Sequence, residues 1–255
     1  MFVSLEGTEG AGKSTVAREL HARLASLGLR ALLTYEPGGT ELGRLVRAIV
    51  RYGLERVAPP EAGCHPCGGE YRQGATSGSS SGKAVGGVSK EVEDRASLLV
   101  PRAETLLFCA ARAQLVDEVI RPHLLAGGVV ICDRYADSTL AYQCYGRGLP
   151  LAATRAVLAF TTAGLWPDLT ILLDVDVREG LSRKREGGLE PRPDRFESQT
   201  VEFHERVRQG YVELAAAEPQ RWRVIDAMRP LDQVVASAWE HVTQRLQTTA
   251  GGTRR

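Results

Sequence analysis

The chain has 255 residues, of which 43% are hydrophobic and 25% are charged, and its formal net charge is +1. These values are typical of a globular protein with a sizeable core, and the balanced charge gives no electrostatic case for binding to nucleic acid or to a membrane surface. No apolar run approaches the ~18 residues that a membrane span needs, and the N-terminus leads into an apolar strand with no room for a signal peptide. Five cysteines without a secretory context favour a reducing cytoplasm over a disulfide framework.

Apolar runs alternate with amphipathic stretches along the chain, which is the pattern of parallel strands joined by helices. The apolar runs predict strands at 2–5, 31–35, 129–132, 169–173 and 223–225. The amphipathic stretches predict helices at 15–26, 41–52, 102–126 and 231 to about 246. We therefore expect an α/β protein with a five-stranded parallel sheet in a three-layer α/β/α arrangement, as a single domain over residues 1–250.

The first predicted strand runs into G-T-E-G-A-G-K-S at 7–14, which has the G-x-x-x-x-G-K-S spacing of a phosphate-binding loop, or P-loop. Its glycines let backbone N–H groups turn toward an anionic phosphate, and the following helix adds the positive end of its dipole. In this arrangement Lys13 reaches the β- and γ-phosphates of a nucleoside triphosphate, and the Ser14 hydroxyl is placed to bind Mg²⁺. Strand, loop and helix occur in the required order, so a chance glycine-rich loop is a weak alternative.

The second predicted strand is followed by E-P-G-G-T at 36–40, at the edge of the sheet where ligands bind in open α/β folds. The simpler interpretation of this motif is a turn before a helix. Beyond that helix, residues 58–94 are rich in glycine and serine and have too few large apolar residues to form a core, so we expect a mobile surface insertion. Cys64 and Cys67 within it form a C-x-x-C pair, but no second pair completes a zinc site, and a chance feature is favoured.

The predicted helix at 102–126 carries Phe108 and Arg112 four residues apart, on one face. An aromatic ring beside a guanidinium can hold a nucleobase by stacking and by donation to a carbonyl oxygen. Taken alone, such a pair is more often a core phenylalanine beside a surface arginine.

The predicted strand at 129–132 delivers Asp133 and Arg134 to the same edge of the sheet. The aspartate fits a position near Mg²⁺ and the arginine fits a phosphate clamp, although a plain ion pair is the simpler alternative. After the fourth predicted strand, an arginine-rich stretch at about 182–197 surrounds a pair of glycines. It predicts a mobile flap that closes over polyphosphate, whereas its cations alone would also suit a solvated helix face.

Together these motifs resemble the thymidylate kinases, which belong to the nucleoside-monophosphate kinases with a P-loop fold. The markers are G-T-E-G-A-G-K-S-T (7–15), E-P-G-G-T (36–40), L-L-F-C-A-A-R-A-Q (106–114), D-R-Y-A-D-S-T-L-A-Y-Q (133–143) and D-R-F-E (194–197). The resemblance covers nearly the whole chain apart from the Gly/Ser insertion. It implies a cytoplasmic, homodimeric enzyme that uses Mg²⁺ and transfers the γ-phosphoryl group of ATP to dTMP, with no nucleic acid or membrane as partner.

The resemblance also implies roles for single residues. On the donor side, Asp133 joins Ser14 at Mg²⁺, and Lys13 and Arg134 are catalytic. The ATP phosphates would be held by Gly7, Thr8, Glu9, Gly10, Ala11, Gly12, Lys13, Ser14 and Thr15. The chain lacks an arginine at 9–11 and has an arginine-rich flap, which resembles the bacterial type, in which flap residues such as Arg185 and Arg192 complete the site.

On the acceptor side, the resemblance implies that Glu9 contacts the 3′-hydroxyl of dTMP and that Arg47 and Arg134 bind its phosphate. Phe108 would stack on thymine, and Arg112 would donate to its 4-carbonyl oxygen. The base contacts are completed by Ser138 and Thr139. The ring of Tyr142 would lie against the 2′ position, where a ribose hydroxyl would clash.

Two alternatives remain open from the residues. The first is a P-loop kinase for another nucleotide or for a deoxynucleoside. The second is a P-loop protein that has lost catalysis and binds a partner through its insertion. Lys13, Ser14, Asp133 and Arg134 are all present, so no catalytic element is visibly missing.

Overall fold

The computed structural model describes residues 1–53, 99–187, 195–196 and 198–251. The predicted insertion at 58–94, with Cys64 and Cys67, lies outside the described residues, as does Arg192 of the predicted flap.

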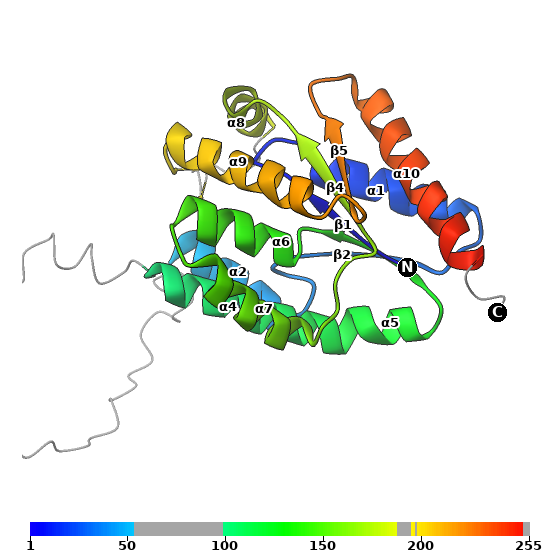
Figure 1. The fold of residues 1–255 in the computed structure, drawn as a ribbon, viewed down its shortest axis with the longest axis horizontal. Coiled ribbons are helices and arrows are strands. Elements are labelled where there is room, and N and C mark those ends of the chain that lie inside the picture. Colours follow the sequence, from blue (N-terminus) through cyan, green and yellow to red (C-terminus); the bar gives the residue numbers. More distant parts are fainter. Residues whose placement is uncertain (54–98, 188–194, 197, 252–255) are drawn as a thin grey trace, which may run out of the picture.

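The five parallel strands that the sequence predicts form one sheet, and their order in it is β2-β3-β1-β4-β5 (Figure 1). The strands are β1 (Phe2–Glu6), β2 (Ala31–Tyr35), β3 (Val129–Asp133), β4 (Leu169–Asp174) and β5 (Trp222–Asp226). β1 is central, and its Leu5 pairs with Asp133 of β3 on one side and with Ile171 of β4 on the other. After β1 the chain forms β2 and β3 on one side of β1, and it then crosses to the other side to form β4. The loop after β1 therefore lies at a switch point, where open α/β sheets bind their ligands.

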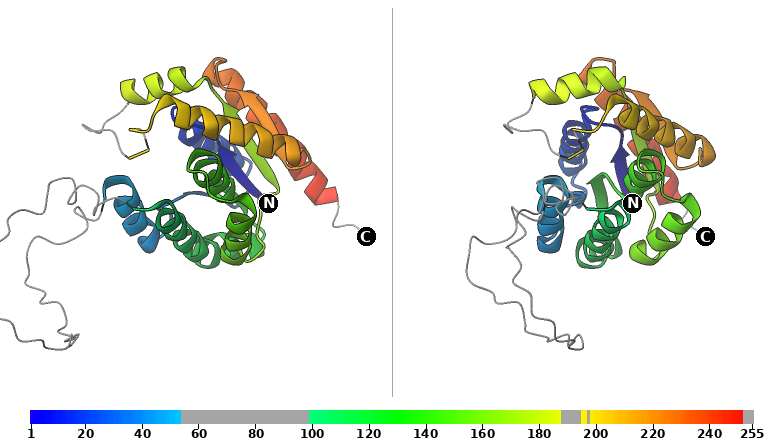
Figure 2. Two further views of the ribbon diagram at one scale, coloured as in Figure 1. Left: turned by 60° about the vertical axis from the view of Figure 1, so that its left-hand side comes forward. Right: turned by 90° about the vertical axis from the view of Figure 1, so that its left-hand side faces the viewer.

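Helices cover both faces of the sheet, so the predicted three-layer arrangement is confirmed (Figures 1 and 2). One face is covered by α1 (Lys13–Ser26) and α10 (Leu231–Gly251), and the other by α4 (Pro101–Leu115), the π-helical η2 (Val116–Ile120) and η3 (Leu140–Gly146), and α9 (Val201–Ala217). Side chains alternate along β1, so Val3 and Leu5 pack under the first set of helices while Phe2 packs under the second. By the same alternation Glu6 lies on the side of Phe2, below α9 and η3.

The remaining helices of the described residues are α2 (Glu41–Tyr52), α5 (Arg121–Leu125), α6 (Ala136–Thr139), α7 (Leu151–Thr162) and α8 (Val177–Glu186). Three of the helices begin at a side-chain cap: Thr40 at α2, Asp176 at α8 and Thr200 at α9 each accept from a backbone N–H of the first turn. The predicted helix at 102–126 is continuous as α4, η2 and α5, and the turn at Gly127 ends it at a φ of 76°. No helix in the described ranges is both long enough and apolar enough to cross a membrane.

Candidate active site

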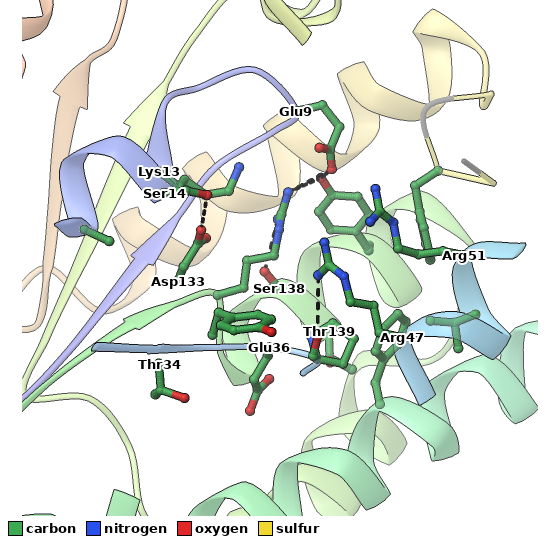
Figure 3. Close-up of a pocket in the computed structure, with 18 of the residues that line it drawn as sticks. Glu9, Lys13, Ser14, Thr34, Glu36, Arg47, Arg51, Asp133, Ser138 and Thr139 are labelled. Atoms are coloured by element: carbon green, nitrogen blue, oxygen red, sulfur yellow. Dashed lines mark hydrogen bonds and ion pairs between the residues drawn. The ribbon is translucent and has the colours of Figure 1, made fainter. Parts of the chain in front are cut away.

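A cavity of about 480 Å³ runs from the loop after β1 to the inner face of α4 (Figure 3). It brings together most of the residues that the sequence predicts. Those that line it are Glu9, Gly10, Gly12, Lys13, Ser14, Thr15, Arg47, Phe108, Arg112, Asp133, Arg134, Ser138, Thr139 and Tyr142. Gly7, Thr8 and Ala11 complete the loop without lining the cavity, and Arg185 is exposed on the last turn of α8. Because Arg185 does not line the cavity and Arg192 is not described, their catalytic role stays a prediction.

The phosphate-binding loop is tightly wound and packs against α8. Gly10 has a φ of 69°, and a Cβ atom there would lie 1.8 Å from the carbonyl oxygen of Gly180. A side chain at Gly10 would therefore meet both an unfavourable backbone conformation and a backbone clash. Lys13, the first residue of α1, donates from Nζ to the carbonyl oxygen of Thr8 at 2.7 Å. Burial, together with repulsion from Arg134, lowers the pKa of Lys13 to about 8, and an anionic phosphate beside it would act in the opposite direction.

Two oxygen-bearing side chains meet beside the lysine. The Ser14 hydroxyl donates to Oδ2 of Asp133, which joins the first turn of α1 to the end of β3 (Figure 3). Hydroxyl and carboxylate oxygens are the ligands that Mg²⁺ accepts next to nucleotide phosphates. The pair therefore fits the metal that the sequence predicts for it.

Arg134 occupies the middle of the cavity, and its backbone is left-handed, with a φ of 69°. Its Nη2 donates to Oε1 of Glu9 at 2.8 Å and to the Tyr142 hydroxyl at 3.2 Å, and that hydroxyl donates to the same Glu9 oxygen at 2.9 Å. Burial alone would raise the pKa of Glu9, but the attraction of Arg134 and Lys13 outweighs burial and lowers this pKa to about 2. Glu9 is therefore an anion that fixes the guanidinium toward the phosphate-binding loop.

A second carboxyl group, Glu6, supports this cluster from below. It accepts from the backbone N–H of Tyr135 at 2.8 Å, from the Ser138 hydroxyl at 2.6 Å and from the Tyr211 hydroxyl at 3.0 Å. Both hydroxyl oxygens in turn accept from Nη1 of Arg134, each at 3.3 Å. Burial raises the pKa of Glu6 to about 8. Glu6 was not predicted as a site residue, and the signal for it was an acidic residue at the end of a mostly apolar strand.

The base end of the cavity contains a buried ion pair that the sequence analysis also missed. Arg112 donates to Oε2 of Glu36 from Nε at 2.9 Å and from Nη2 at 2.6 Å, and Nη2 also donates to the Thr139 hydroxyl at 3.0 Å. Burial acts to lower the pKa of Arg112, but the carboxylate of Glu36 reverses this and raises it. Glu36 thus occupies one edge of the guanidinium. Among the described residues, the other nitrogen, Nη1, makes only a long contact of 3.9 Å to the sulfur of Cys109, so it is the atom left for a ligand.

Aromatic rings and an amide complete this end. Phe108 lines the cavity together with Phe196, whose ring centroid is 6.0 Å away, and Tyr142 makes an edge contact with Phe196 at 6.0 Å. Gln143 lines it from η3. Gln143 and Phe196 stood inside predicted motifs, but no role was predicted for either.

Further cations line the cavity between its two ends. Arg47 and Arg51 extend from α2 into this middle region (Figure 3), and Lys184 lines it from α8. Nη1 of Arg47 donates to the carbonyl oxygen of Pro37 at 3.5 Å. Arg51 was not predicted, although its spacing of four residues from Arg47 places the two on one face of the helix.

A cavity with a phosphate-binding loop at one end and an aromatic chamber with a guanidinium at the other suits an enzyme that moves a phosphoryl group between two nucleotides. On this parallel sheet, that combination defines the P-loop nucleotide kinases. A sequence profile described as thymidylate kinase matches residues 5–60 and 75–238, and the chain belongs to the thymidylate kinase family.

Individual relatives agree over nearly the whole chain. A thymidylate kinase of Deinococcus radiodurans is 43% identical over 245 residues, which is 96% of this chain and 97% of the relative. One of Desulfovibrio desulfuricans is 43% identical over 239 residues, covering 92% of this chain and 91% of the relative. The crystal structure of a thymidylate kinase from Ehrlichia chaffeensis superimposes with a TM-score of 0.62 at 25% identity, covering 95% of this chain and 98% of that one.

Proposed function

We propose that the chain is an ATP-dependent dTMP kinase that transfers the γ-phosphoryl group of ATP to dTMP, giving dTDP and ADP for dTTP synthesis. Membership of the family supports this activity. The observation that carries the proposal is the single cavity shared by Lys13 of the phosphate-binding loop and by Phe108 with Arg112. A donor and an acceptor nucleotide bound at its two ends would meet at Arg134.

On the donor side, the backbone of residues 7–15 binds the ATP phosphates and Lys13 contacts the β- and γ-phosphates. Ser14 and Asp133 hold Mg²⁺, which neutralises phosphate charge when it is bound. The contact between these two side chains supports the assignment, because it places two hard oxygen donors side by side.

On the acceptor side, Phe108 stacks on thymine and Nη1 of Arg112 donates to its 4-carbonyl oxygen. Arg47 and Arg134 bind the phosphate of dTMP, and Glu9 accepts from its 3′-hydroxyl. Further contacts are assigned to Ser138 and Thr139 at the base and to Tyr142 beside the 2′ position. The ion pair between Glu36 and Arg112 supports the base contact, because it holds the guanidinium in one orientation before substrate arrives.

The reaction needs little covalent work from the protein. An oxygen of the dTMP phosphate attacks the γ-phosphorus in line with the departing ADP, and this oxygen is already anionic, so no general base is required. Lys13 and Arg134 stabilise the charge that spreads over the transferring group, and the arginine-rich segment at about 182–197, with Arg185 and Arg192, completes the shield against water.

The test is an assay of ADP release with dTMP, dUMP, dCMP, dGMP and UMP as acceptors. We expect dTMP to be used with the highest kcat/KM, and UMP to be rejected at the 2′ position. Purified protein with no turnover on any of these would contradict the activity and favour a P-loop binding protein. A preference for a purine acceptor would contradict the base assignment.

We further propose that one kinase domain spans residues 1–250, with an insertion at about 58–94, and that the enzyme acts in the cytoplasm. The buried cysteines Cys109, Cys132 and Cys144 are unpaired, and unpaired cysteines are typical of a reducing compartment.

We also propose that the enzyme is a homodimer that pairs through α4 and α7. These helices pack side by side, and their outer face carries Leu106 at 57% exposure and Phe160 at 85%. Around Phe160, α7 exposes a stripe of small apolar side chains, formed by Ala152, Ala156 and Ala159. A smooth apolar face of this kind lets a second copy approach closely.

Sedimentation of Phe160→Asp tests the dimer. We expect wild type to sediment as a dimer and the variant as a monomer at micromolar concentration. Leu125→Asp, at a position 82% exposed on α5, is the matched control and should remain dimeric. A dimeric Phe160→Asp variant would place the interface elsewhere.

A further inference from the structure

Beneath the base end of the cavity lies a carboxylate that does not line the cavity itself. Glu104, in the first turn of α4, is 1% exposed; it accepts hydrogen bonds from two side chains of another segment and forms an ion pair with a third. Nε2 of Gln143 donates to it at 3.1 Å, Nε of Arg147 donates at 3.3 Å, and Nη2 of Arg195 lies at 3.5 Å. Of these three side chains, Gln143 is the one that lines the cavity.

The contact with Glu104 determines which way the Gln143 amide faces. A carboxylate flanked by two guanidiniums can only accept hydrogen bonds, so the amide must turn its NH₂ group toward Glu104. Its carbonyl oxygen then points away from the carboxylate. Gln143 is 1% exposed and has little room to reverse this orientation. The carbonyl oxygen of Gln143 therefore remains free of Glu104, and it can accept from a ligand in the cavity.

This acceptor lies near a donor. Arg112 and Gln143 line the same cavity, and Arg112 is bonded to Thr139, which precedes Gln143 by about one helical turn. A donor beside an acceptor matches a pyrimidine with a 4-carbonyl oxygen and a proton on N3, as in thymine and uracil. Cytosine presents the opposite pattern, with a 4-amino group and an unprotonated N3.

We propose that Glu104 is a positioning residue that sets the discrimination between 4-keto and 4-amino pyrimidines, by fixing the Gln143 amide with its oxygen toward the base. The proposal rests on the dTMP kinase activity proposed above. Glu104 does not contact the substrate and acts through Gln143. A site built to pair with one hydrogen-bonding pattern rejects the reversed pattern strongly, because buried groups would be left unpaired.

The test compares kcat/KM for dTMP, dUMP and dCMP in wild type and in Glu104→Gln. A glutamine at 104 can donate as well as accept. The Gln143 amide can therefore flip, with its carbonyl oxygen toward residue 104 and its NH₂ group toward the base. We expect the dTMP/dCMP ratio of kcat/KM to fall about tenfold or more. The dTMP/dUMP ratio should stay within about twofold, because these bases share the pattern at positions 3 and 4, and the KM for ATP should also be unchanged. A purely structural role for Glu104 would lower all three activities together.

Three further variants separate the alternatives. Gln143→Met should lower the dTMP/dCMP ratio, and adding Glu104→Gln to it should cause no further fall, since Glu104 acts through the amide. Arg147→Met removes another partner of Glu104 and should lower thermal stability while leaving the ratio within about threefold. Glu104→Asp, which keeps the negative charge next to the arginines, should lower the ratio by a smaller factor even if Glu104→Gln fails to fold.

An unchanged dTMP/dCMP ratio in both Glu104 variants would overturn the proposal, as would a further fall when Glu104→Gln is added to Gln143→Met. If the proposed dTMP kinase activity were itself wrong, the result would differ, because the wild-type protein would then not prefer dTMP.

Discussion

The two ends of the cavity are built in different ways. The proposed donor end is built mainly from one continuous piece of chain, residues 7–15, which Asp133 at the end of β3 joins through Ser14. The acceptor end collects side chains from α2, α4 and η3, and its buried cation Arg112 is held by the opposite charge of Glu36. Between the two ends, the partly exposed Arg134 is held by Glu9. We therefore expect changes at the donor end to remove chemistry and leave the fold intact. Changes at the acceptor end should alter substrate use and stability together.

The largest effect is expected at the donor end. Lys13→Ala should lower turnover by ~10³ or more, because in the proposed mechanism the lysine stabilises charge on the transferring phosphoryl group. The thermal midpoint should stay near that of wild type, since the ammonium group makes one hydrogen bond within its own loop. Steady-state kinetics and thermal unfolding measure the two quantities. A variant that retains a tenth of wild-type activity would show that Lys13 is not part of the chemistry.

The buried ion pair of Arg112 and Glu36, at the base end of the cavity, should affect stability as well as activity, in contrast to Lys13. Glu36→Gln leaves the Arg112 charge buried without its partner and should destabilise the protein by ~3–5 kcal/mol. Arg112→Ala should lower kcat/KM for dTMP by roughly 10–150-fold, equivalent to ~1.5–3 kcal/mol, while ATP affinity stays nearly constant.

The double variant Glu36→Met/Arg112→Met separates stability from function. It should be more stable than Glu36→Gln, because no unpaired charge remains, and it should still use dTMP poorly. Chemical denaturation and ADP-release kinetics supply the measurements. If Glu36→Gln unfolds at the same denaturant concentration as wild type, Glu36 does not hold Arg112 in the way described.

Glu6 lies under the boundary between the two ends, and its effect should depend on pH. Burial raises the pKa of Glu6 from 4.5 to about 8, so the folded protein binds a proton there that the unfolded chain releases. Between these two pKa values the unfolded state holds fewer protons, and the free energy of unfolding therefore falls as pH rises. The fall due to this group should be on the order of 4 kcal/mol between about pH 5 and pH 9.

Glu6→Gln should remove this part of the pH dependence, so the variant gains stability relative to wild type at high pH. Denaturant unfolding at a series of pH values tests the expectation. Parallel profiles for the two proteins would rule it out.

The smallest effect is expected outside both ends. Replacing residues 63–87 with a short linker should leave kcat and both KM values within about threefold, because the segment contributes to no nucleotide-binding motif. Ordering the backbone costs ~1–2 kcal/mol per residue, and this Gly/Ser-rich segment has too few large apolar residues to offset that cost. A large fall in thermal midpoint, or zinc that co-purifies with the intact chain, would instead make Cys64 and Cys67 part of a structural site.

The difference between local sequence patterns and contacts between distant residues explains which features could be predicted from the sequence. Each strand of the sheet is a short apolar run with clear limits, and the residues that follow β1 and β3 reach the cavity because strand ends share one edge. The acidic partners follow no local pattern: Glu36 and Arg112 are 76 positions apart, and Glu6 and Tyr211 are 205 apart. Only tertiary packing brings such pairs together, so Arg112 and Arg134 were predicted as site residues, whereas Glu36, which orients Arg112, and Glu6, which lies beneath Arg134, were not.

The contact between Gly10 and Gly180 has a consequence for how this sequence can vary. Each glycine lacks room for a single carbon atom, since a Cβ on Gly180 would lie 2.4 Å from the carbonyl oxygen of Glu9. The two positions belong to distant parts of the chain, and a substitution at either one would push α8 off the phosphate-binding loop. Neutral drift can therefore alter neither position alone, and a library of random variants should be depleted at both to a similar degree. A helix interior that would otherwise gain stability from alanine is held at glycine by a loop that lies far from it in the sequence.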